Sequence, residues 1–129
     1  MLIRIKTLFK DNILYISICV TLLIAILSLI KLSEGTTINV THIDKLEHAF
    51  AYSILTLSWL FTFNNSFHKK EVRYLVVCSC VFYGIIIEVL QTTLTTYRTA
   101  SFLDVLANTI GVLVAFIIFK RFFKNNTAI

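Results

Sequence analysis

Residues 84 to 115 read GIIIEVLQTTLTTYRTASFLDVLANTIGVLVA, an apolar stretch that a few polar groups interrupt. The interruptions include a carboxylate at Glu88, an amide at Gln91, a guanidinium at Arg98, a second carboxylate at Asp104 and a second amide at Asn108. On insertion scales an ionisable side chain costs about 2.5 to 3.5 kcal/mol at the centre of a membrane-spanning helix. Several such groups in one apolar stretch therefore indicate a function or a specific packing need.

The composition around this stretch is that of a membrane protein. Of 129 residues, 57% are hydrophobic, 11 are Phe and none is Pro. At about 20 residues per span, the length admits four transmembrane helices with short connections. We therefore expect an all-α membrane fold, a four-helix transmembrane bundle that forms one domain over residues 1–129. The uncharged runs place the spans at about residues 12–30, 47–67, 74–97 and 104–119.

The basic residues are divided unequally between the two sides of such a bundle. The amino terminus, the loop between the second and third spans and the carboxyl terminus together carry nine Lys or Arg residues, and the other side carries three. Because basic residues favour the cytoplasmic side, we expect both termini in the cytoplasm and the polar clusters toward the outer face. This distribution accounts for the formal charge of +5, and we expect no nucleic-acid partner.

Polar stripes follow the third and fourth spans. Spacings of three and four residues place the members of each stripe on one helix face. They are Gly84, Glu88, Gln91 and Thr95 in the third span, and Asp104, Asn108, Gly111 and Ala115 in the fourth. Glycine beside polar residues predicts close packing of helices around a polar centre. A network that only holds the bundle together is the alternative to a functional site.

A second polar cluster, Asp44-Lys45-Leu46-Glu47-His48, opens the second span. Asp44 and His48 are four residues apart, so the carboxylate can reach the imidazole and fix its tautomer, as a general base or a metal ligand requires. Helix capping is the simpler explanation for Asp44 and Asp104, but it does not explain His48. No HExxH or similar ligand spacing is present, and we assign neither a metal nor another cofactor.

The two clusters resemble each other at a separation of 60 residues. Thr41-His-Ile-Asp44-Lys-Leu-Glu-His48 aligns with Ser101-Phe-Leu-Asp104-Val-Leu-Ala-Asn108, and each segment begins a span that runs from outside to inside. The pattern suggests two helical hairpins related as parallel repeats, with the polar site between them. Chance and common helix-start chemistry are the other explanation.

At these residues the chain resembles the VanZ-like family of small bacterial membrane proteins. The resemblance covers roughly residues 40 to 115 and rests on three short motifs in order. They are Asp44-Lys45-x-x-His48 with Tyr52, Glu88-x-x-Gln91, and Arg98-x5-Asp104-x3-Asn108-x2-Gly111. The resemblance implies a multi-pass protein of the bacterial inner membrane, in a family whose founding member is associated with resistance to the glycopeptide teicoplanin. This chain looks like a minimal version without an appended domain.

These observations lead to a specific expectation for function. We expect an outward-facing polar pocket in the cell envelope that binds the head group of an envelope lipid or a lipid-linked cell-wall component. A stronger form of this hypothesis is that the protein also modifies the head group. His48, Glu88 and Asp104 are the candidate catalytic residues, with His48 as acid or base. The candidate substrate-binding residues are Asp44, Lys45, Gln91, Arg98 and Asn108. Of these, Arg98 would bind a phosphate or carboxylate of the ligand. Tyr52, Gly84 and Gly111 are expected to be structural.

Two other functions fit the same residues. One is a non-catalytic membrane interaction or scaffold module, in which the polar stripes bind partner helices or a second copy of the chain in a homo-oligomer. The other is a small proton-linked transporter, with Glu88 as the proton relay.

Overall fold

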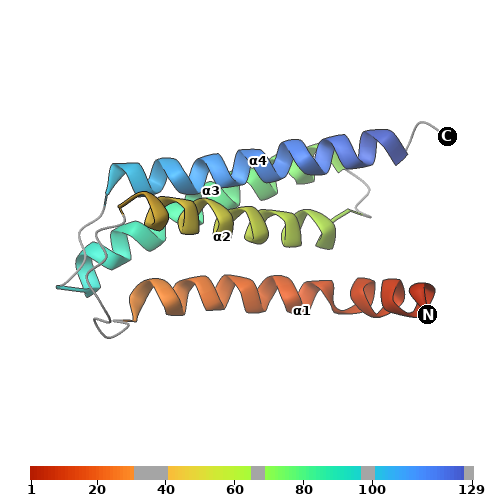
Figure 1. The fold of residues 1–129 in the computed structure, drawn as a ribbon, viewed down its shortest axis with the longest axis horizontal. Helices are drawn as coiled ribbons and strands as arrows, with labels where there is room; N and C mark the ends of the chain where they lie inside the picture. The colour runs from red at the N-terminus through yellow and green to blue at the C-terminus, as the bar shows by residue number, and fades with distance from the viewer. Residues whose placement is uncertain (31–40, 65–68, 97–100, 127–129) are drawn as a thin grey trace.

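A computed structural model describes residues 1–30, 41–64, 69–96 and 101–126, and these residues form a bundle of long helices (Figure 1). The helices are α1 (Leu2–Leu29), α2 (Thr41–Thr62), α3 (Lys69–Leu94) and α4 (Phe102–Asn126). The expectation of an all-α, four-helix fold is confirmed. Every described element is a helix because, inside a lipid bilayer, only helices and closed barrels satisfy their own backbone hydrogen bonds.

The helices form two antiparallel hairpins, α1 with α2 and α3 with α4, and both chain termini lie at the same end of the bundle (Figure 1). Helix α2 runs parallel to α4, and these two helices share the most extensive contact. Around the bundle the order is α1, α2, α4, α3, and α2 also touches α3. This arrangement is the one that two parallel-repeat hairpins would produce, and the duplication itself stays a prediction.

Three of the described helices are long and apolar enough to cross a membrane, namely α1, α3 and α4. Helix α2 is less apolar because its first two turns carry Asp44, Lys45, Glu47 and His48. It contacts each of the other three helices and lies alongside them in the bundle (Figure 1). Of its polar residues, His48 is largely enclosed between helices, whereas Glu47 is exposed. That α2 forms the fourth span stays a prediction.

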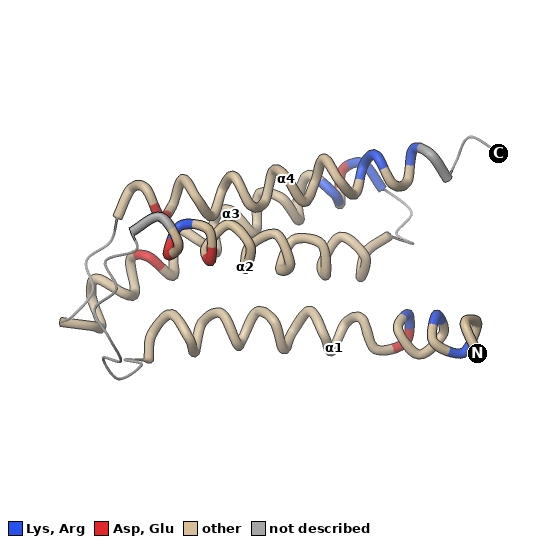
Figure 2. Tube along the Cα trace, in the orientation of Figure 1, with Lys and Arg blue, Asp and Glu red and all other residues tan. Residues whose placement is uncertain are grey.

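Charge is separated along the length of the bundle (Figure 2). Most of the described Lys and Arg residues gather where α1 begins, α3 begins and α4 ends, which we call the basic end. At the opposite end, which we call the acidic end, α2 and α4 begin and α3 ends, and the described acidic residues there are Asp44, Glu47, Glu88 and Asp104. Such a separation is typical of a bundle whose basic end faces the cytoplasm. The cytoplasmic position of the termini stays a prediction.

The helix bounds differ from the predicted spans at most ends, with the largest difference where α1 begins. Helix α1 begins at Leu2 rather than near residue 12, because the basic residues before the apolar run continue the same helix. Helix α2 ends at Thr62, earlier than the predicted boundary at residue 67, and its last described residues are in a turn at Phe63 and Asn64.

Helices α2 and α4 approach each other closely at Gly111. A Cβ atom built on Gly111 would lie 2.1 Å from the backbone oxygen of Ala49. Beside this crossing the Ser53 hydroxyl donates to the backbone carbonyl of Gly111 over 2.9 Å. Only a residue without a side chain at position 111 lets the two backbones come this close. This contact is consistent with the structural role predicted for Gly111.

Hydroxyl groups attach α1 to the rest of the bundle. The Trp59 indole donates to the Thr21 hydroxyl over 3.0 Å, and the Tyr83 hydroxyl donates to the Thr21 backbone oxygen over 2.6 Å. Near the basic end the Ser17 and Thr62 hydroxyl oxygens lie 2.8 Å apart. These bonds fix the face of α1 that points inward, and they position its last turn over the acidic end.

Candidate functional site

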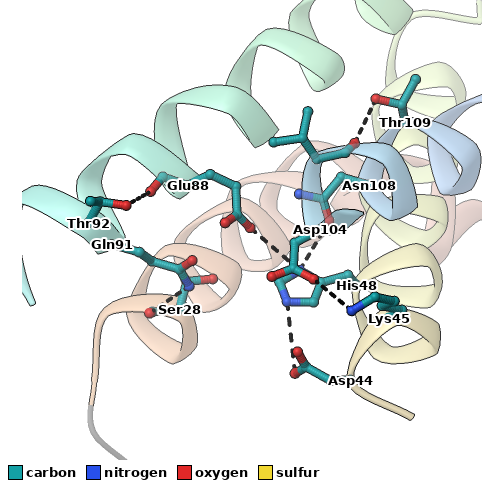
Figure 3. Close-up of polar contacts among 11 residues, drawn as sticks. Ser28, Asp44, Lys45, His48, Glu88, Gln91, Thr92, Asp104, Asn108 and Thr109 are labelled. Carbon is teal, nitrogen blue, oxygen red and sulfur yellow. Dashed lines mark hydrogen bonds and ion pairs between the residues drawn. The ribbon is translucent and has the colours of Figure 1, made fainter. Parts of the chain in front are cut away.

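The imidazole of His48 is the centre of the polar cluster at the acidic end (Figure 3). Its Nδ1 atom lies 3.1 Å from Oδ1 of Asn108 on α4 and 3.9 Å from Oε1 of Glu88 on α3. Its Nε2 atom lies 4.0 Å from Oδ1 of Asp44 on the preceding turn of α2. The structure therefore brings residues from three helices to one ring.

The amide of Asn108 selects a tautomer of this ring. When Nδ1 carries the proton, the imidazole donates to the Asn108 carbonyl oxygen, and the lone pair of Nε2 faces Asp44. His48 and Asn108 are the residues that align in the 60-residue comparison of the two hairpins. Equivalent residues of two parallel repeats meet in this way when they lie near the axis that relates the repeats.

Asp104 enters the cluster from the first turn of α4. Its Oδ1 lies 3.6 Å from Nζ of Lys45, an ion pair between α4 and α2 (Figure 3). Among the described residues at the acidic end, Lys45 is the one basic side chain. The carboxylates of Asp44 and Asp104 both lie in first helical turns, where a negative charge is favourable, and both also face this cluster. Capping and participation in a site are thus compatible.

Glu88 is almost completely enclosed, with 2% of its surface exposed. Asn108 and Tyr52 are equally buried, and Gly84 lies against both of them. A Cβ built on Gly84 would lie 3.1 Å from the Tyr52 ring and 3.4 Å from Asn108. Gly84 and Tyr52 therefore pack beside Asn108, and their structural role stays a prediction.

Gln91 contacts the end of α1, and its role in substrate binding stays a prediction. Its amide nitrogen donates to the backbone oxygen of Ser28, near the end of α1, over 3.0 Å. This bond ties α3 to α1 beside the cluster (Figure 3). Of the other predicted binding residues, Asp44, Lys45 and Asn108 lie in the cluster, and Arg98 falls outside the described residues.

A cavity of about 220 Å³ opens beside His48, between α1 and α2. Asp44, His48 and Tyr52 line it from successive turns of α2, and Glu47 and Ser28 add further polar groups. Sequence reasoning did not include Glu47 and Ser28 among the site residues. The signal for Glu47 was its place within the Asp44 to His48 turn, whereas the inward direction of Ser28 depends on how α1 docks.

The positions of Gly84 and Gly111 concern the alternative hypothesis of a non-catalytic interaction or scaffold module. Gly84 and Gly111 are buried inside a single chain, against Tyr52, Asn108 and the backbone of Ala49. They serve the packing of one bundle, so replacing them would disturb that packing before it disturbed any contact between copies.

Comparison with known proteins gives one result for nearly the whole chain. A family model described as VanZ/LLP1 matches residues 6–124. Neither a search of curated proteins nor a search of solved structures returned a match. The matched range includes all four helices and every residue of the cluster described above. The resemblance seen in the motifs is confirmed, and the chain is a membrane protein that belongs to the VanZ/LLP1 family.

Proposed function

We propose that the cavity beside His48 binds the head group of an anionic envelope lipid or of a lipid-linked cell-wall component in the bacterial inner membrane. The observation that carries this proposal is the cluster of His48, Glu88 and Asn108 next to a cavity of about 220 Å³ near one end of the bundle. In a membrane protein this end is the level at which lipid head groups begin.

The polar cluster is more elaborate than stability requires. Hydrogen bonds between membrane helices average about 0.6 kcal/mol, whereas insertion of an acidic side chain costs about 2.5 to 3.5 kcal/mol. Glu88 is buried to 2% exposure and lies within 3.9 Å of His48. Such a group is retained at a cost to stability, which is the usual pattern of a functional site.

The cavity is accessible from the membrane boundary. The Asp44 side chain at its mouth is 46% exposed, and the His48 side chain deeper in the cavity is 13% exposed. A ligand that enters past Asp44 meets an imidazole whose Nδ1 atom lies 3.1 Å from Oδ1 of Asn108. The same arrangement would let His48 give or accept a proton, so modification of the bound head group is an extension of the proposal.

Arg98 provides the test of anionic binding. The full chain is purified in mild detergent, and the lipids that copurify are identified by native mass spectrometry. We expect the parent to retain an anionic lipid and the Arg98→Ala variant to lose most of it, because a guanidinium is the preferred partner of phosphate and carboxylate groups.

Arg121→Ala is the matched control, since Arg121 is exposed at the basic end. This variant should retain the lipid as the parent does. Equal retention by all three proteins, or equal loss in both variants, would contradict a specific site for the anionic group at the acidic end.

A further inference from the structure

Two carboxylates and an imidazole from different helices converge beside the cavity. Asp44 and His48 of α2 and Asp104 of α4 each offer one ligand atom, and these atoms lie within 4.8 Å of one another. Oxygen and nitrogen ligands bound at about 2.0 to 2.2 Å to a tetrahedral ion such as Zn²⁺ lie about 3.3 to 3.6 Å from one another. Side-chain movements of about 1 Å would therefore bring the three atoms to a common ion.

The tautomer of His48 fits such a role. With the Nδ1 proton shared with the Asn108 oxygen at 3.1 Å, the Nε2 lone pair is directed to the side on which Asp44 lies. Histidine ligands of metal ions almost always donate their other ring N–H to an oxygen in this manner.

Tyr52 lines the cavity one turn below His48, on the same face of α2 as Asp44 and His48. Its side chain is 2% exposed, and its ring lies beside Tyr83 and against Gly84 of α3. Tyr52 therefore closes the deep end of the cavity toward α3 and leaves the three ligand atoms nearer its mouth.

The charge of the cluster gives the third argument. Among the described residues near His48, four carboxylates, those of Asp44, Glu47, Glu88 and Asp104, are set against one ammonium group, that of Lys45. An anionic head group would meet net repulsion in this cavity. A divalent cation would reverse the local charge and join the head group to the carboxylates.

We propose that Asp44, His48 and Asp104 bind a divalent cation of the first transition series, which in turn holds the anionic head group. The inference rests on the proposed function for its cavity and gives His48 the role of a ligand. It also gives Lys45 a role: its ion pair with Asp104 at 3.6 Å occupies a ligand of the site, so Lys45 competes with the metal ion.

Mn²⁺ is a suitable probe because it favours carboxylate and imidazole ligands over the cysteine thiols elsewhere in the chain. The full chain is purified in detergent, treated with a chelator and dialysed. Free Mn²⁺ is then measured by its electron paramagnetic resonance signal during a titration. We expect one Mn²⁺ per chain, at least tenfold weaker binding in His48→Ala and in Asp104→Asn, and tighter binding in Lys45→Met.

Glu71→Gln is the matched control, because Glu71 is an exposed carboxylate at the basic end and does not belong to the three-ligand group. It should bind Mn²⁺ within twofold of the parent. Absence of stoichiometric binding to the parent would overturn the inference, and so would equal weakening in Glu71→Gln and His48→Ala. Because Lys45→Met removes no ligand, weaker binding in this variant would also overturn the inference even if the ligand variants failed to fold.

The lipid and metal experiments fail independently. Lipid retention that depends on Arg98, without Mn²⁺ binding, would leave the proposed function and remove the cation. Mn²⁺ binding at the three ligands, without lipid retention, would leave the cation site and remove the lipid head group.

Discussion

Gly111→Ala should separate the two helices that carry the site. The added Cβ would lie 2.1 Å from the Ala49 backbone oxygen and 2.9 Å from its Cα. An ordinary contact begins at 3.4 Å, so the methyl group must move from 2.1 to 3.4 Å, a displacement of about 1.3 Å. The obstacle is backbone, which cannot rotate away as a side chain can. The bond between Ser53 and the Gly111 carbonyl lies at this crossing and would weaken.

The expected change in the free energy of unfolding is the sum of two opposing effects. Overpacking costs typically about 1 to 3 kcal/mol, and a backbone obstacle places this case at the upper end. The better helix propensity of Ala returns up to about 1 kcal/mol. We therefore expect the free energy of unfolding to fall by about 2 kcal/mol, measured by reversible unfolding in mixed micelles.

Gly84→Ala is the control for this experiment. Its Cβ would meet the edge of the Tyr52 ring at 3.1 Å, which requires a shift of only a few tenths of an ångström. Here we expect a change within about 1 kcal/mol of the parent, since the propensity gain offsets the small clash. If Gly111→Ala were as stable as the parent, or more stable than Gly84→Ala, the described crossing of α2 and α4 would be wrong.

Three further variants test the rest of the bundle. Phe119→Ala should lower the free energy of unfolding by more than about 2 kcal/mol, because Phe119 is 1% exposed. Phe122 is 58% exposed, so Phe122→Ala should leave the free energy of unfolding nearly unchanged. Equal effects of the two changes would contradict the packing at the basic end. Trp59→Phe should cost about 0.6 kcal/mol in the same assay through loss of the indole bond to α1, and an unaltered value would mean that this bond contributes nothing to docking of α1. In a cysteine-free background, a membrane-impermeant maleimide added to intact cells should label Leu103→Cys at the acidic end and spare Lys124→Cys at the basic end; the reverse pattern would refute cytoplasmic termini.

Local patterns were sufficient to predict the helices. Uncharged runs of about 20 residues leave little alternative to spanning helices in a chain of this length. The spacing of Glu88, Asn108 and Gly111 within their helices also predicted which faces turn inward, because one face of a helix repeats every three to four residues.

Contacts that depend on helix register could not be predicted in this way. The ion pair between Lys45 and Asp104 joins two helices whose relative height is set by the Gly111 crossing. Gln91 bonds to the Ser28 backbone because of where the last turn of α1 docks, and no sequence spacing records that position. The group of Asp44, His48 and Asp104 is divided between α2 and α4, so it has no local ligand motif to find.

The central claim is that the polar cluster around His48 is kept for function at a cost to stability. Its most direct test is the melting temperature of Glu88→Gln in detergent beside the parent, with Ser17→Ala as a structural control. Removal of the buried charge relieves its desolvation and its repulsion with the neighbouring carboxylates, whereas Ser17→Ala loses a packed hydroxyl contact with Thr62. The account predicts that Glu88→Gln melts at the same temperature as the parent or higher, while Ser17→Ala melts lower. A clearly lower melting temperature for Glu88→Gln would contradict it and assign the cluster to holding the bundle together.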